Sequence, residues 1–200
     1  MTDPYLLIQI EHLKAAWSRG QEQLEQALPA RKDGDCLSFQ AFGQDCELCH
    51  EKISLAGEPL TGPEGILISL YARHVRNEPL ELQPLQSFKE LPNSAPYQGA
   101  FVSRSEQIFV PHVPAIQRQQ QAIVQQFSGR INTDAPSGDF SFTLYPLPRI
   151  PLYLIFYLPD EEFPATATCL FAADVTKHLP IDGLADVAEH TAKRIIELVQ

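Results

Sequence analysis

DFSFTLYPL at residues 139–147 and IPLYLIFYL at residues 150–158 decide the fold class, because both are apolar runs of the length of a strand. The second run is apolar almost throughout, which is typical of a central strand that is covered on both faces. Side chains alternate between the two faces of a strand. We therefore expect Leu152, Leu154 and Phe156 to lie on one face of a buried strand.

Further elements are predicted on both sides of these two strands. ATATCLFAA at residues 165–173 predicts a third strand, and CLSFQAF with CELCHEKISL, at 36–42 and 46–55, predicts a hairpin that turns at 43–45. Apolar residues at helical spacing predict four helices, at 4–28, 63–76, about 105–129 and 182–199.

This order of elements predicts an α+β fold. We expect an antiparallel sheet of about five strands, packed by the N- and C-terminal helices and by the central helices. A chain of 200 residues suits a single domain over 1–200. Within it, an N-terminal helix and hairpin (1–60) precede a helical middle (61–130) and a strand-rich core with the final helix (131–200).

Composition and charge exclude several classes of partner. The formal net charge of −10 disfavours sequence-independent binding to nucleic acid and to anionic membrane surfaces, both of which need clustered Lys and Arg. The longest apolar run falls far short of the roughly 20 residues that span a bilayer. The N-terminus lacks the basic segment of a signal peptide, so we expect a cytoplasmic protein whose four cysteines are thiols or metal ligands, not disulfides.

Cys46-Glu-Leu-Cys49-His50 has the spacing at which a c-type haem is attached, which makes a haem protein one alternative. Another alternative is a zinc or iron–sulfur site made by Cys36, Cys46, Cys49 and His50. The predicted hairpin argues against the haem, because strand alternation sends Cys46 and Cys49 to opposite faces. The metal site is disfavoured because it needs about four convergent ligands and the sequence offers only one close pair. Small buried or half-buried thiols on a strand are the favoured interpretation, and no metal is favoured.

A family resemblance rests mainly on LYPLPRIPLYLIFYLPDEEFPATATCLFAADVTKHLPIDGLADV at residues 144–187, with SFKELPNSAPYQGAF at 87–101 as a weaker block. These segments resemble the bacterial and archaeal domain-of-unknown-function family DUF3786. The resemblance implies a compact cytosolic domain, common in anaerobes and sometimes joined to iron–sulfur modules, with no established reaction. Ala172 departs from the aspartate that the family pattern leads us to expect after Leu170-Phe171.

The turn PDEEFP is the first candidate binding site. Asp160, Glu161 and Glu162 offer carboxylates for a hard cation or for acid–base chemistry. The alternative is a charged turn that prevents edge association and is anchored by a buried Phe163.

Asp174 and His178 complete the ligand-binding candidates. His178 would approach the acidic turn if the third strand returns antiparallel, and a His–carboxylate pair can transfer protons.

Two main hypotheses of function follow, and neither assigns a catalytic residue with a known role. The first is a non-enzymatic cytoplasmic module that binds a cofactor, a small molecule or a protein partner, such as an iron–sulfur protein, in an anaerobic pathway. The second is an enzyme that uses the acidic turn with His178 for metal-assisted or acid–base chemistry. The sequence contains neither a G-x-S-x-G elbow nor a phosphate-binding loop, and the cofactor stays unassigned.

Overall fold

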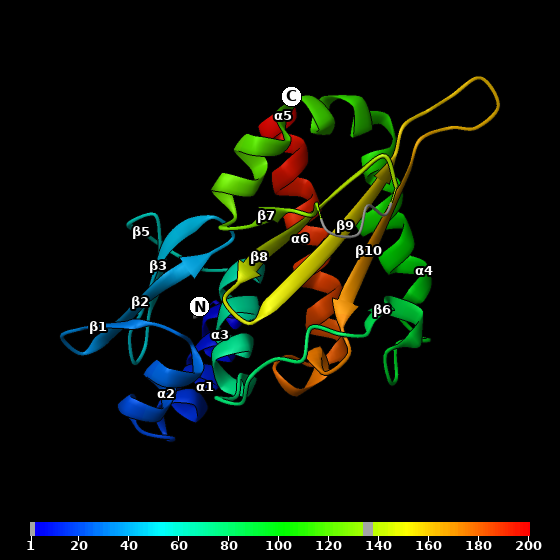
Figure 1. Ribbon diagram of the computed structural model, residues 1–200. Coiled ribbons are helices and arrows are strands. Elements are labelled where there is room, and N and C mark those ends of the chain that lie inside the picture. The colour runs from blue at the N-terminus through cyan, green and yellow to red at the C-terminus, as the bar shows by residue number, and fades with distance from the viewer. Residues whose placement is uncertain (1–2, 134–137) are drawn as a thin grey trace.

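The computed structural model describes residues 3–133 and 138–200. Its fold is α+β, as expected, but the described residues form two five-stranded antiparallel sheets where the sequence predicted one. The small sheet has its strands in sequence order: β1 (Arg31–Asp33), β2 (Cys36–Ala41), β3 (Gln44–Leu48), β4 (Ile53–Leu55) and β5 (Glu58–Pro59). Figure 1 shows this sheet at one side of the molecule, next to the first two helices.

The large sheet is built mostly from the C-terminal third of the chain. Its strand order is β6 (Leu85–Ser87), β10 (Thr166–Ala172), β9 (Ile150–Tyr157), β8 (Phe140–Leu147) and β7 (Arg130–Ile131). The run at 150–158 is therefore the central strand, as predicted.

One face of β9 forms the middle of the core. Leu152, Leu154 and Phe156 are each at most 2% exposed, which confirms that they share a buried face. The opposite face is only partly covered, because Tyr157 is 50% exposed. The expectation of a strand covered on both faces was thus correct for only one of them.

The helices pack mainly behind the large sheet and beside the small one (Figure 1). They are α1 (Pro4–Trp17), α2 (Gln21–Ala27), α3 (Pro63–His74), α4 (Gln98–Phe101), α5 (Val113–Gln126) and α6 (Ile181–Val199). A π-helical turn (Val102–Glu106) and a 3₁₀ segment (Gln107–His112) join α4 to α5. One cluster of buried apolar side chains includes residues of both sheets and of these helices. None of the helices in the described part of the chain is both long and apolar enough to span a bilayer.

Three predicted elements differ from the structure. The helix expected at 4–28 breaks into α1 and α2 at Gly20, whose φ of 87° is not helical. The strand expected at 46–55 ends at Leu48, and the chain turns through 49–52 before β4 begins. The connection expected at 77–104 contains β6, a 3₁₀ turn (Phe88–Glu90) and α4, so the helical stretch that leads to α5 begins at Gln98 and not near residue 105.

Arg149, the basic residue of the LPRIP motif, fixes the large sheet to the N-terminal helices. Its guanidinium donates hydrogen bonds to the carbonyl oxygens of Ala27 (2.8 Å), Gln26 (3.2 Å) and Glu78 (3.2 Å). Its backbone N–H donates to the hydroxyl of Tyr71 at 3.1 Å. The planar guanidinium can donate to several carbonyl oxygens at once, and here it joins the end of α2 to the segment that follows α3. Arg149 therefore has a structural role.

Candidate functional site

The acidic turn lies at the tip of the β9–β10 hairpin, which projects from the body of the molecule (Figure 1). The Asp160 carboxylate accepts hydrogen bonds from the backbone N–H groups of Glu162 (2.8 Å) and Phe163 (2.7 Å), so this turn is locally ordered. Phe163 is 66% exposed. The expectation that a buried Phe163 anchors the turn was therefore wrong.

The acidic turn and His178 are far apart. The turn precedes β10, and Asp174 and His178 follow it. The strand has seven residues, which at about 3.3 Å per residue separates its two ends by roughly 23 Å. The predicted His–carboxylate pair therefore does not form.

Asp174 and His178 instead hold local structure. The Asp174 carboxylate accepts a hydrogen bond from the backbone N–H of Glu81 at 3.1 Å and lies 3.5 Å from the Lys177 ammonium. His178 is fully buried, and its Nδ1 accepts from the backbone N–H of Arg76 at 3.4 Å. Its Nε2 has no hydrogen-bond partner within the residues described. Burial and then the nearby Arg149 charge lower the pKa of His178.

This buried histidine makes the stability of the fold depend on pH. The pKa of His178 lies below its ordinary value of 6.5 in the folded chain, so the unfolded chain takes up the proton first as the pH falls. The free energy of unfolding should have its full value above about pH 6.5 and should decrease as the pH falls below 6.5. His12 and His74, whose pKa values burial also lowers, add to the same slope.

Urea unfolding at a series of pH values checks this expectation. His178→Asn should give a shallower dependence than the wild-type chain between about pH 6.5 and pH 5. An unchanged slope in a folded variant would mean that His178 does not take part.

The cysteines of the small sheet do not form the sites that the sequence suggested. Cys36 and Cys49 form a disulfide across β2 and the end of β3, with their Cα atoms 4.3 Å apart. This corrects the expectation of unpaired thiols for Cys36 and Cys49, whereas Cys46 and Cys169 are free and buried. Cys46 is 1% exposed and faces the core. Cys46 and Cys49 point to opposite faces, as alternation predicted, so they do not converge on one haem or, with Cys36 and His50, on one metal.

Trp17 of α1 supports the segment that carries Cys49. Its Nε1 donates a hydrogen bond to the Cys49 carbonyl oxygen at 3.0 Å. Its indole stacks on the His50 imidazole, with ring centroids 4.1 Å apart. His50 therefore lies against Trp17 and not beside the Cys46 thiol, which is buried in the core.

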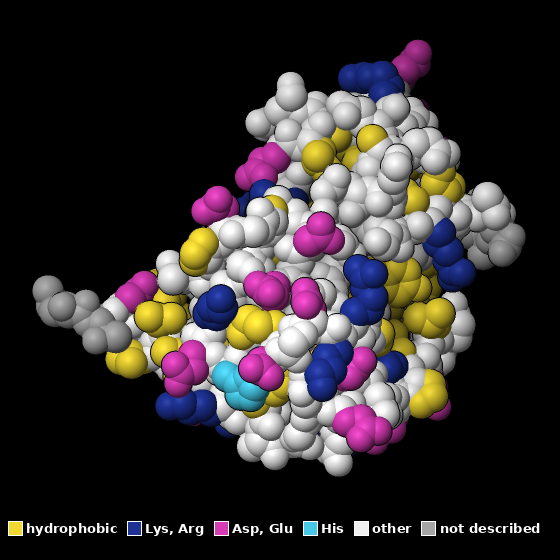
Figure 2. Space-filling model, turned by 90° about the vertical axis from the view of Figure 1, so that its left-hand side faces the viewer, with side chains coloured by type: hydrophobic (Ala, Val, Ile, Leu, Met, Phe, Trp, Pro, Cys, Tyr) yellow, Lys and Arg dark blue, Asp and Glu magenta, His cyan; other side chains and the backbone are white. Residues whose placement is uncertain are grey.

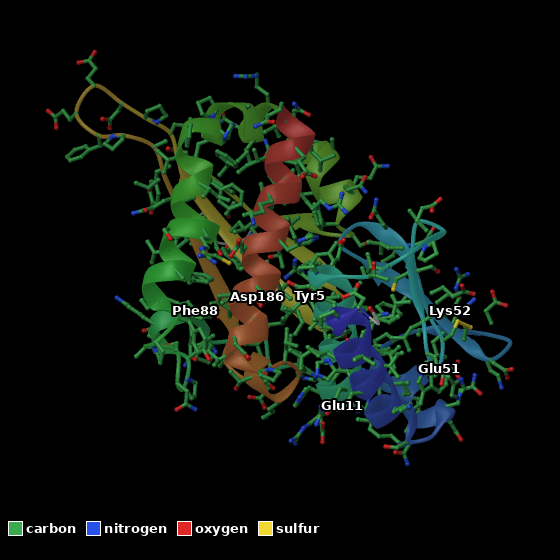
Figure 3. The ribbon with its side chains drawn as sticks, turned by 180° about the vertical axis from the view of Figure 1, so that it is seen from behind. Tyr5, Glu11, Glu51, Lys52, Phe88 and Asp186 are labelled. Atoms are coloured by element: carbon green, nitrogen blue, oxygen red, sulfur yellow. A yellow bond between two sulfur atoms is a disulfide. The ribbon has the colours of Figure 1, made fainter. Side chains whose placement is uncertain are left out.

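A pocket of about 220 Å³ lies between α3 and α6, and none of its lining residues is a candidate that the sequence singled out. Its floor is apolar and its rim is charged. We call it the α3–α6 pocket, and it is lined by Pro63, Ile66, Leu67, Leu70, Glu64, Asp186, Glu189, His190 and Lys193. In Figure 3, Asp186 lies on α6 near the middle of the molecule, whereas Glu51 and Lys52 lie at the outer edge of the small sheet.

Most charged groups of the α3–α6 pocket are already paired. Glu64 accepts a hydrogen bond from His190 at 2.8 Å and lies 3.5 Å from the Arg194 guanidinium. Partial burial favours a higher pKa for Glu64, but His190 and Arg194 outweigh it and the pKa is lowered. Glu189 pairs with Lys193 at 2.6 Å.

Asp186 differs from the other acids of this rim. Within the described residues its carboxylate has no hydrogen-bond or ion-pair partner, although those of Glu64 and Glu189 both have one. Partial burial and the charges of Glu189 and Asp182 raise the pKa of Asp186. An unpaired carboxylate over an apolar floor is suited to a ligand that brings a positive charge.

The signal for this pocket was present in the sequence. Asp186, Glu189, His190 and Lys193 recur at spacings of three and four residues, which places them on one face of the final helix. The sequence did not reveal that α3 would lie opposite this face, because that depends on tertiary packing.

The family model Domain of unknown function (DUF3786) matches residues 21–194. The chain belongs to the DUF3786 family. The match includes every strand of both sheets, and it covers the α3–α6 pocket, whose residues run from 63 to 193. No curated protein and no solved structure matches the sequence significantly.

Proposed function

We propose that this DUF3786 chain is a non-enzymatic, cytoplasmic binding module, and that it takes a small organic amine in the α3–α6 pocket. The observation that carries the proposal is the unpaired Asp186 carboxylate at the rim of an apolar pocket. An ammonium group can pair with Asp186 while the carbon skeleton covers the apolar floor formed by Ile66 and Leu70.

The size of the pocket limits the ligand. Its volume of about 220 Å³ is below the roughly 300–1,000 Å³ of sites for drug-sized molecules. The ligand in this proposal is therefore a compact amine and not a dinucleotide or a tetrapyrrole. The setting that we propose is the anaerobic, iron–sulfur-linked metabolism that the family resemblance implies, with an iron–sulfur protein as the partner.

Binding of a panel of small primary amines, measured by isothermal titration calorimetry, tests this function. Alcohols of the same carbon skeleton serve as neutral controls. At least one amine should bind, its alcohol should not, and Asp186→Asn should weaken binding by about tenfold or more, as expected for loss of a charge-assisted contact.

Asp182→Asn is the matched control variant. It removes the same charge from the same helix, but Asp182 does not line the pocket. Its effect should stay within about threefold, because Asp182 does not contact a ligand in the pocket and acts on it only at a distance, through solvent. Failure of every amine to bind, or unchanged binding by a folded Asp186→Asn protein, would overturn the proposal.

A further inference from the structure

We propose that Cys36, Glu47 and Cys49 form a redox-gated site for a thiophilic divalent cation such as Zn²⁺. One ligand atom of each side chain, two sulfurs and a carboxylate oxygen, lies within 4.8 Å of the other two. This set differs from the four-residue site that the sequence suggested. It omits Cys46 and His50, and it includes Glu47 of β3, which lies two residues before Cys49.

The pairing of β2 with β3 brings these three side chains to one face. Leu37 pairs with Leu48 in the register of the two strands, which places Cys36 opposite Cys49. Leu37 and Leu48 point to the core, so their neighbours point outward. Glu47 precedes Leu48 and shares the outer face with Cys49.

Surrounding groups suit a metal on this face. The Ser54 hydroxyl donates a hydrogen bond to the Glu47 carboxylate at 3.3 Å, the kind of contact that orients a metal ligand. Glu47 and Ser54 both line a hollow of about 580 Å³ on the outside of the small sheet. Zinc binds thiolates and carboxylates in tetrahedral sites, and sites with three protein ligands take water in the fourth position. Of the three proposed ligands, Glu47 lines this hollow and so connects the site to solvent.

Figure 2 views the side of the molecule that carries the small sheet. Acidic and basic side chains are interspersed there, so no field of a single charge directs ions to this face. The recognition that we propose comes from the two thiolates and not from general attraction of cations.

The disulfide and the metal exclude each other. Two thiolates on one tetrahedral zinc lie about 3.8 Å apart, because each Zn–S bond is about 2.3 Å long. A dithiol reductant reduces the disulfide by two electrons and two protons and itself becomes a disulfide. The two thiols then bind Zn²⁺ as thiolates and release two protons. In the reverse direction a disulfide oxidant reforms the Cys36–Cys49 bond, and the metal leaves as Zn²⁺ while two protons are taken up.

Zinc titration of the whole chain in its two redox states tests the proposal. Protein reduced with a phosphine, which does not compete as a thiol ligand, is titrated in the presence of a chromogenic zinc chelator. We expect one Zn²⁺ per reduced chain and at least tenfold weaker binding by the oxidised chain. This comparison needs no variant, so it remains valid even if a substitution prevents folding.

Three variants identify the ligands in the reduced state. Cys36→Ser with Cys49→Ser should abolish binding, and Glu47→Gln should weaken it by about tenfold or more, in the range expected for loss of a group that tunes a metal site. Asp45→Asn is the matched control, because Asp45 lies on the same strand and lines the same hollow. Its affinity should stay within about threefold.

Three results would overturn the proposal. They are an absence of stoichiometric zinc in the reduced wild-type chain, equal binding by the oxidised chain, and affinity in Glu47→Gln that equals that of Asp45→Asn. Amine binding at the α3–α6 pocket does not depend on this site, so either proposal can fail alone.

Discussion

Replacement of Trp17 by alanine should lower the free energy of unfolding by about 3–5 kcal/mol, the usual cost of truncating a buried aromatic side chain. Trp17 is 9% exposed and belongs to the same buried cluster as the strands of both sheets. The variant loses the packing of the indole, and it also leaves the Cys49 carbonyl oxygen without its hydrogen bond. Unfolding in urea, followed by circular dichroism, measures the difference.

Leu7→Ala is the control for this substitution. Leu7 lies on the same helix but is 56% exposed, so its truncation should cost within about 0.5 kcal/mol. If both variants lose the same small amount, α1 does not dock on the core through Trp17.

Loss of the Cys36–Cys49 disulfide should have the second largest effect on stability. The bond joins residues with a sequence separation of 13. Closing a loop of about this length lowers the entropy of the unfolded chain, which stabilises the folded chain by about 3 kcal/mol. The oxidised wild-type chain should therefore be about 2–4 kcal/mol more stable than the Cys36→Ser/Cys49→Ser chain.

The same comparison in a phosphine reductant and a metal chelator supplies the control. Without disulfide and metal, the two chains should differ by less than about 1 kcal/mol, since serine replaces a thiol of similar size. A difference of several kcal/mol that persists under reduction would show that packing of the sulfurs, and not the bond, stabilises this hairpin.

The large sheet could be predicted from sequence because its strands are long and apolar. Strands β8, β9 and β10 agree with their predicted bounds to within a residue at most ends. Of the small sheet, only the β2–β3 hairpin was predicted, and the rest was missed for the opposite reason. Its strands β1, β4 and β5 have three residues or fewer, which is too short for alternation to be visible.

The CxxCH motif at residues 46–50 shows which part of a site can be predicted from sequence. Alternation along one strand was enough to separate Cys46 from Cys49, and the structure confirms that separation. The partner of Cys49 could not be predicted, because it depends on the register between two strands. That register is set by a two-residue turn at Phe42 and Gly43, both at positive φ, and not by the turn expected at 43–45.

The acidic turn illustrates the limit of motif reasoning about a surface. Its residues have the right chemistry for a cation site, but a hairpin that leaves the body of the fold places them away from other ligands. The final helix gave the more useful pattern, in which charges at helical spacing mark one exposed face. The other wall of the pocket is α3, which lies about 120 residues earlier in the chain. The Glu64–His190 contact, for example, joins residues 126 positions apart in the sequence.

Mapping of the cysteines by mass spectrometry tests most directly the claim that the CxxCH motif is divided between two faces of a sheet. The native oxidised chain is treated with an alkylating reagent, digested without reduction, and analysed for linked and modified peptides. We predict a peptide pair linked through Cys36 and Cys49, with Cys46 and Cys169 unmodified until the chain is denatured, because both are buried. A Cys46–Cys49 linkage, or rapid modification of Cys46 in the folded chain, would contradict the account.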